Sequence, residues 1–144
     1  MIDHRQLGVE LFNATWAFLD MEKRTAEHDD EMIYTAYASR YHWSQASYEE
    51  KHQARGEWQL SRVFSVLGRG EPAVYHAERC LEWCGRGEVE DWDLAFAYEA
   101  LARAHGVAGN ADEAARFKLK AREAGDGIAD AENREHFDGD YATL

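Results

Sequence analysis

Proline, cysteine and long apolar runs are scarce in this sequence of 144 residues. A single proline and the lack of a Gly/Ser-rich stretch leave no segment with the composition of a linker, so we expect residues 1–144 to form one domain. No apolar stretch approaches the roughly 20 residues of a membrane span, and Met1–Gln6 lacks the apolar segment of a signal peptide. Because Cys80 and Cys84 do not form a C-x-x-C pair, we expect two reduced thiols in a cytoplasmic protein.

Positive charge and catalytic motifs are scarce as well. Sixteen Lys and Arg residues stand against 28 Asp and Glu residues, which gives a net charge of −12. This balance argues against nucleic acid and anionic membranes as partners. The sequence also lacks a G-x-S-x-G elbow, a Gly-rich phosphate loop and an H-E-x-x-H pattern. We therefore expect a protein that is not an enzyme and that uses no cofactor.

Apolar residues at helical spacing, with few β-branched runs, predict an all-α fold. Glycines and charged segments divide the chain into three helical hairpins at about 4–45, 47–84 and 91–124, followed by a C-terminal helix at about 128–141. We interpret the charged run Asp20–Asp30 as the turn of the first hairpin, so that its second helix begins at about Glu31. Gly85–Glu90 is expected to be a loop.

Four positions carry the signals of a helix N-terminus. Asp3, Asp91 and Asn110 each precede an apolar periodic segment and have side chains that cap helices well. Ser47, with Glu50 three residues later, has the pattern of a capping box. The neighbouring Trp92 is then explained as a residue that anchors the start of a helix.

The second and third hairpins repeat one pattern at an offset of 41 residues. The matched pairs are Leu60 and Leu101, Phe64 and His105, Gly68 and Gly109, and Ala73 and Ala114. A fixed period with two helices in each unit is typical of an α-solenoid, in which hairpins stack in a row.

These matched residues resemble the tetratricopeptide repeat. Its first helix carries Leu, a small residue and an aromatic residue, its turn contains Gly, and its second helix opens with a small residue. Leu60-Ser61-Phe64-Gly68-Ala73 follows this pattern, and Leu101-Ala102-His105-Gly109-Ala114 does so with His in the aromatic place. The R-G-E-W and D-W-D-L-A-F-A-Y-E-A-L-A-R-A segments also resemble small, uncharacterised bacterial proteins of this kind. The resemblance implies a right-handed solenoid of about three hairpins plus the C-terminal helix.

The same resemblance implies that the first helix of each hairpin lines a concave groove. The groove positions carry over to Arg55, Trp58, Arg62, Phe96, Glu99 and Arg103. Arginines bind carboxylates with forked hydrogen bonds, and aromatic rings provide apolar contact. We therefore expect a protein or peptide partner, with an acidic or C-terminal segment in the groove. The alternative is that the arginines pair with carboxylates of the stack itself, at Glu57, Glu99 or Asp93.

Two other kinds of function stay open. A pocket between hairpins that contains His42, His52, His76 and Glu99 would bind a metal or a small molecule, although no two of these histidines have a ligand-pair spacing on one helix. A structural homo-oligomer, such as a homodimer, would form if an end of the stack paired with a second copy, because the ends of solenoids expose apolar surface unless they are capped.

Overall fold

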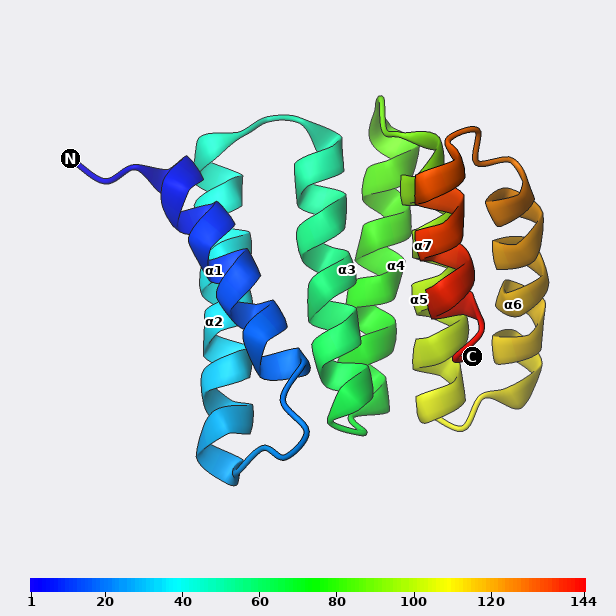
Figure 1. Ribbon diagram of the computed structural model, residues 1–144, viewed down its shortest axis with the longest axis horizontal. Helices are drawn as coiled ribbons and strands as arrows, with labels where there is room; N and C mark the ends of the chain where they lie inside the picture. Colours follow the sequence, from blue (N-terminus) through cyan, green and yellow to red (C-terminus); the bar gives the residue numbers. More distant parts are fainter.

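The computed structural model describes all 144 residues and contains seven α-helices and no strand (Figure 1). The helices are α1 (His4–Leu19), α2 (Ala26–Ala46), α3 (Glu50–Val66), α4 (Gly70–Arg86), α5 (Asp91–Val107), α6 (Ala111–Asp126) and α7 (Ala131–Tyr141). The predicted all-α class is confirmed. None of the helices combines the length and the apolarity that crossing a lipid bilayer requires.

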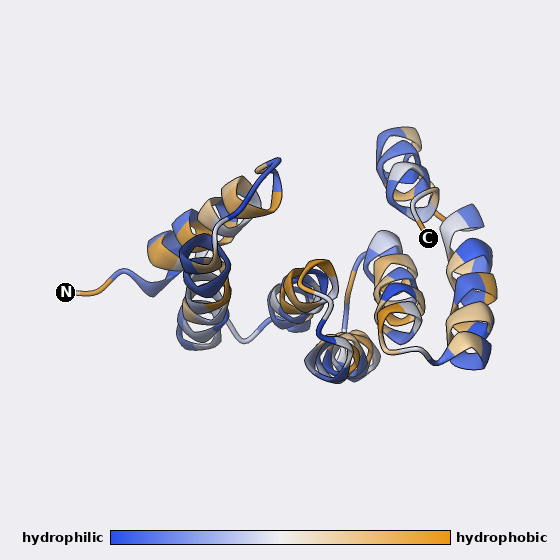
Figure 2. Ribbon diagram, turned by 90° about the horizontal axis from the view of Figure 1, so that it is seen from below, coloured by the Kyte–Doolittle hydropathy of each residue, from blue (hydrophilic) through white to orange (hydrophobic).

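Consecutive helices pack against one another along the chain. The most extensive contacts join α1 to α2, α3 to α4 and α5 to α6, and further contacts join α2 to α3 and α4 to α5. These contacts are compatible with a helical-repeat arrangement. Figure 2 shows α1 and α7 on the same side of the row, with α3 between them. Helix α7 packs on α5 and α6.

The turns of the second and third hairpins have the same backbone conformation. Gly68 has a φ of 73° and Gly109 a φ of 82°, a left-handed region that glycine enters without steric cost. In each turn the N–H one residue after the glycine bonds the carbonyl five residues earlier, from Arg69 to Phe64 and from Asn110 to His105, both at 2.9 Å. These bonds are those of a Schellman motif. The matched glycines of the sequence repeat are thus equivalent in structure.

The repeat also holds one stacked ring pair in each hairpin. Phe64 on α3 stacks on His76 of α4, with ring centroids 5.8 Å apart and planes 6° apart. His105 on α5 stacks on Phe117 of α6, at 5.6 Å and 5°. The ring types are exchanged, which explains how His105 occupies an aromatic position. Leu60 and Leu101 are almost fully buried in the main core beside these pairs.

The predicted start of the second helix at Glu31 is wrong, because α2 begins at Ala26. The Thr25 side chain accepts a hydrogen bond from the backbone N–H of His28, and His28 Nδ1 accepts one from the Thr25 N–H at 3.2 Å. Histidine therefore replaces the usual Glu or Gln of a capping box, and half of the charged run Asp20–Asp30 belongs to the helix.

The capping predictions had mixed outcomes. Asp3 does cap α1, since its carboxylate accepts from the Gln6 N–H at 3.0 Å. The Ser47 capping box is wrong, because Ser47 ends α2 and its hydroxyl lies 2.8 Å from His52 Nδ1. Asn110 precedes α6 as predicted, but it makes no side-chain capping bond.

The remaining boundaries differ by a few residues. Glu90 rather than Asp91 is the N-cap residue of α5, and the Asp91 carboxylate instead accepts from the Ala129 N–H at 3.0 Å. Helix α4 continues to Arg86, so the predicted loop is shorter than Gly85–Glu90. Helix α7 begins at Ala131, three residues after the predicted start at 128, and Asp130 caps it.

Candidate functional site

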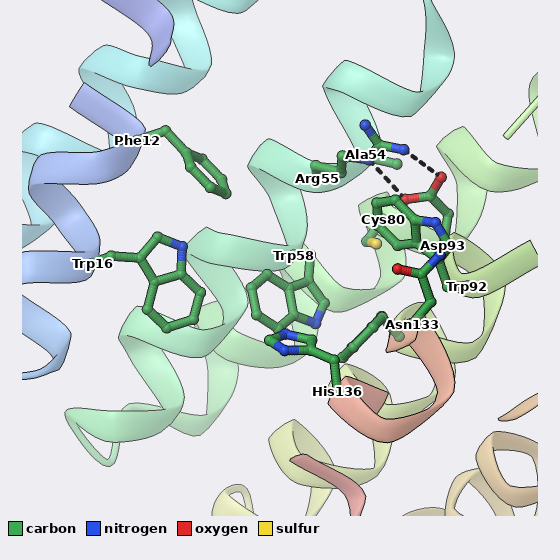
Figure 3. Close-up of a pocket in the computed structure, with 11 residues that line it drawn as sticks. Phe12, Trp16, Ala54, Arg55, Trp58, Cys80, Trp92, Asp93, Asn133 and His136 are labelled. Atoms are coloured by element: carbon green, nitrogen blue, oxygen red, sulfur yellow. Dashed lines mark hydrogen bonds and ion pairs between the residues drawn. The ribbon is translucent and has the colours of Figure 1, made fainter. Parts of the chain in front are cut away.

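An open pocket of about 360 Å³ lies between α1, α3, α5 and α7 (Figure 3). Five aromatic side chains dominate its lining: Phe12 and Trp16 from α1, Trp58 from α3, and Trp92 and Phe96 from α5. The other lining residues are Ala54, Arg55, Cys80, Asp93, Asn133 and His136. Aromatic side chains that line an open, mostly apolar pocket are typical of a binding site.

Trp58 stands at the centre of the aromatic lining. Its ring lies 5.7 Å from Trp16 and 5.7 Å from Phe96, which meets it edge to face. Helix α1 makes few direct contacts with α3, and one of the bonds between them runs from the Gln59 side-chain amide to the Phe12 carbonyl at 3.0 Å. The position of α1 is therefore fixed mainly by its packing on α2. On that side the pocket is lined by aromatic rings, Phe12 and Trp16, and not by closely packed backbone.

Arg55 and Asp93 form a bidentate ion pair on the lining. Two parallel bonds of 3.0 Å join the guanidinium to both carboxylate oxygens. Asp93 also accepts from the Glu90 N–H at 2.9 Å, and the Arg55 guanidinium lies 4.2 Å from the centroid of the Trp92 ring. The two charges cancel, so the pocket is apolar and close to neutral.

A second charged group, built around Glu99, adjoins the pocket. The Glu99 side chain is fully buried and accepts from Arg103 at 2.6 and 2.9 Å and from Arg62 at 3.3 Å. Its other oxygen lies 3.4 Å from Trp58 Nε1. Arg62 also approaches the Asp140 carboxylate at 3.4 Å. We call Arg62, Glu99, Arg103 and Asp140 the charged cluster.

All six groove residues expected from the sequence lie in one of these two neighbouring places. Arg55, Trp58 and Phe96 line the pocket, while Arg62, Glu99 and Arg103 belong to the charged cluster. The pairing of arginines within the stack, which was the alternative, is present at Asp93 and Glu99. Glu57 pairs with none of the three groove arginines and instead contacts His76 at 3.2 Å and Arg40 at 3.7 Å.

Several pocket residues were not identified from the sequence. Phe12 and Trp16 come from a hairpin without a recognisable repeat pattern, and Asn133 and His136 come from α7. Trp92 is missing from the expected set because its position beside Asp91 and Asp93 was already explained by helix capping. A signal was present, since Phe12 and Trp16 are four residues apart and share a helix face.

The structure does not bring the four residues of the histidine hypothesis together. His42 pairs with His4 at 2.9 Å, His52 stacks on Trp43 at 4.5 Å, and His76 bonds Tyr37 at 2.8 Å. Glu99 is bonded to arginines. No group of three or more His, Cys, Asp or Glu side chains is placed to hold a metal ion.

Cys80 is the one thiol on the pocket lining. A hydrogen bond with Cys84 and burial raise the pKa of Cys80 well above its ordinary value. The thiolate is the nucleophilic form of cysteine, so the local environment of Cys80 opposes nucleophilic chemistry.

Comparison with known proteins adds no assignment, because no protein-family model, no curated protein and no solved structure matches the chain.

Proposed function

We propose that the protein is a non-enzymatic binding module that holds a peptide segment of a partner protein. A bulky apolar side chain of that segment enters the aromatic pocket. The observation that carries this proposal is the set of five aromatic rings around an open space of about 360 Å³. Aromatic residues provide much of the binding energy at protein interfaces, and they do so in pockets that exclude water.

The charges around the pocket support an apolar anchor rather than a purely acidic ligand. Arg55 is neutralised by Asp93, and Glu99 and Asp140 together balance Arg62 and Arg103. The net charge of −12 also opposes the approach of a strongly acidic segment. The apolar side chain should therefore supply most of the affinity, and an acidic residue of the partner should act as a secondary contact.

We also propose that the helices form a right-handed solenoid of the tetratricopeptide type. Two features support this. The Schellman turn and the stacked ring pair recur at an offset of 41 residues, and the first helices of all three hairpins contribute to one pocket. The cytoplasm fits such a module, because Cys80 and Cys84 are both free thiols.

Peptide selection tests the proposal. The protein is panned against a display library of random 12-residue peptides, and binding is measured by fluorescence anisotropy of labelled hits. We expect the selected sequences to share a Trp, Phe, Leu or Ile. We also expect the Asn133→Trp variant, which adds a ring at the pocket rim, to weaken binding at least tenfold.

The matched control is Glu135→Trp, which adds the same ring to α7 at an exposed position outside the pocket lining. Its affinity should equal that of the parent protein. Selected peptides that bind the Asn133→Trp variant as tightly as the parent would place the binding site elsewhere.

A small aromatic molecule is a second candidate ligand, favoured by the pocket volume. About 360 Å³ lies within the range of roughly 300–1,000 Å³ that is common for small-molecule sites. Saturation-transfer NMR with indole and naphthalene distinguishes the candidates. Submillimolar binding of either compound, together with a failed peptide selection, would favour the small molecule.

A further inference from the structure

The segment after Phe137 lies across the arginines of the charged cluster. Arg103 donates to the Asp140 carbonyl at 3.1 Å and to the Thr143 hydroxyl at 2.6 Å. The Asp140 carboxylate lies 3.4 Å from Arg62, and Leu144 packs against the main core. We call Asp140–Leu144 the strap. It occupies the part of the α3–α5 surface where an acidic partner was expected from the sequence.

The acidic residue of the strap, Asp140, completes the charge balance of the cluster. The buried carboxylate of Glu99 is shared by two guanidinium groups, so it neutralises only one of them. Asp140 supplies the second negative charge. The side chain of Asp140 is 26% exposed, whereas that of Glu99 is 0% exposed. The more exposed carboxylate can be exchanged for another without uncovering the buried one.

The strap can leave without the rest of α7. Phe137 is fully buried against Phe96 and Ile128, and a Cβ at Gly125 would overlap its ring, so the middle of α7 is held by tight packing. The strap begins three residues later, at the last turn of the helix. Its release would fray that turn and break the bonds to Arg62 and Arg103. It would also separate the Tyr141 ring from Phe137, 5.8 Å away, and the Tyr141 hydroxyl from the Lys118 carbonyl at 3.3 Å, while Phe137 itself stays in place.

The pocket and the strap are directly connected. Arg62 lies 5.3 Å from the centroid of the Trp58 ring, and Trp58 lines the pocket. Asn133 and His136, on the same helix as Asp140, form part of the pocket lining. The position that Asp140 occupies is thus linked to a partner side chain in the pocket through Arg62 and Trp58.

We propose that the strap is a built-in competitor for the acidic part of the partner. The partner then carries a bulky apolar residue with Asp or Glu a residue or two away, and its carboxylate replaces that of Asp140 beside Arg62 and Arg103. The exchange conserves the charge of the cluster, so affinity for the carboxylate is limited by the cost of releasing the strap. This inference rests on the proposed peptide-binding function and adds its regulation.

Two labelled synthetic peptides test the competition in the chain of 144 residues. G-S-W-G-D-S-G and G-S-W-G-N-S-G share a tryptophan anchor and differ in one carboxylate. Their affinities are measured for the parent, for Asp140→Asn/Thr143→Ala and for Glu135→Gln, a control at an exposed residue of α7. We expect the carboxylate preference, the ratio of the two Kd values, to be at least tenfold greater in the double variant than in the parent and the control.

The variant Arg62→Met/Arg103→Met should show no preference for either peptide. If both peptides bind but the preference is the same in the parent and in Asp140→Asn/Thr143→Ala, the strap is not a competitor and the peptide-binding function stands. If neither peptide binds any form of the protein, both the function and the strap inference fail.

A second measurement avoids dependence on the stability of the variants. In the parent protein, the methyl signals of Thr143 and Leu144 are followed by NMR during titration with each peptide. We expect the Asp-containing peptide to move them toward the positions of a disordered chain and the Asn-containing peptide to leave them unchanged. Unchanged signals with the Asp-containing peptide bound in the pocket would overturn the inference.

Discussion

Glu99→Gln is the substitution that most directly tests the charged cluster. In the structure one fully buried carboxylate bonds Arg103 through two donors, approaches Arg62 at 3.3 Å and lies near Trp58 Nε1. Glutamine keeps the shape but removes the charge, and with its carbonyl oxygen toward the guanidinium groups its amide N–H groups would face the Trp58 Nε1–H donor. Two cations would then share the single charge of Asp140.

The expected loss in the free energy of unfolding depends on how deeply Glu99, Arg62 and Arg103 are buried. Removing one partner of a buried ion pair costs about 3–5 kcal/mol. The Arg62 and Arg103 side chains are 15% and 18% exposed, so water can solvate part of their charge after the substitution. We therefore expect a loss at the lower end, about 3 kcal/mol, which corresponds to a decrease in Tm of roughly 10 °C for a chain of this size.

Urea and thermal unfolding followed by circular dichroism measure this loss. The matched control is Glu113→Gln, which breaks the exposed ion pair with Arg116 on α6 and should leave the midpoint nearly unchanged. Adding Arg103→Met to Glu99→Gln removes one excess cation and should recover part of the stability. A decrease for Glu99→Gln no larger than that of the control would refute the view that this carboxylate organises the α3–α5 surface.

Three further predictions concern other parts of the chain. Gly68→Ala and Gly109→Ala should each destabilise the protein by about 1–2 kcal/mol in urea unfolding, because both glycines have positive φ. Gly106→Ala, at a helical position where an added Cβ meets no neighbour, should be neutral or stabilising, and equal effects at all three positions would contradict the turn assignment. Burial lowers the pKa of His52 below its ordinary 6.5, so the unfolded chain binds a proton before the folded chain does, and stability should fall as the pH drops through about 6.5. His52→Gln should reduce that fall, and the same dependence of stability on pH in the variant and the parent would exclude the effect. Iodoacetamide at about pH 7 should label Cys80 far more slowly in the native protein than in urea, because its hydrogen bond with Cys84 and its burial raise its pKa; equal rates would show an accessible thiol.

The helical hairpins could be predicted because their signals are local. Gly68 and Gly109 mark turns that only a positive φ can make, and the apolar spacing around Leu60 and Leu101 fixes the buried faces. The capping errors have a physical cause. Ser47 has a sequence pattern that fits a capping box, but His52, five residues later, lies beside its hydroxyl. A side chain with two available partners cannot be assigned from spacing alone.

Only part of the candidate site could be anticipated, because the rest depends on tertiary packing. Trp58 and Phe96 lie on the repeated helices, so their shared surface follows from the repeat. Trp16 and His136 reach the same pocket from α1 and α7, which have no repeat pattern to set their register. The sequence left Glu57, Glu99 and Asp93 open as partners of the arginines, and the pairing of Arg62 and Arg103 with Glu99 depends on tertiary packing because three residues from two helices meet there.

The indole N–H signals of the five tryptophans give the most direct test of the central claim that the aromatic pocket is the binding site. Three of them, Trp16, Trp58 and Trp92, line the pocket, whereas Trp43 and Trp83 lie outside it and serve as internal controls. Titration with a selected peptide, followed by ¹H–¹⁵N NMR, should shift the three pocket signals with one common Kd and leave the other two in place. Shifts confined to Trp43 or Trp83, with the pocket signals unmoved at saturation, would contradict the account.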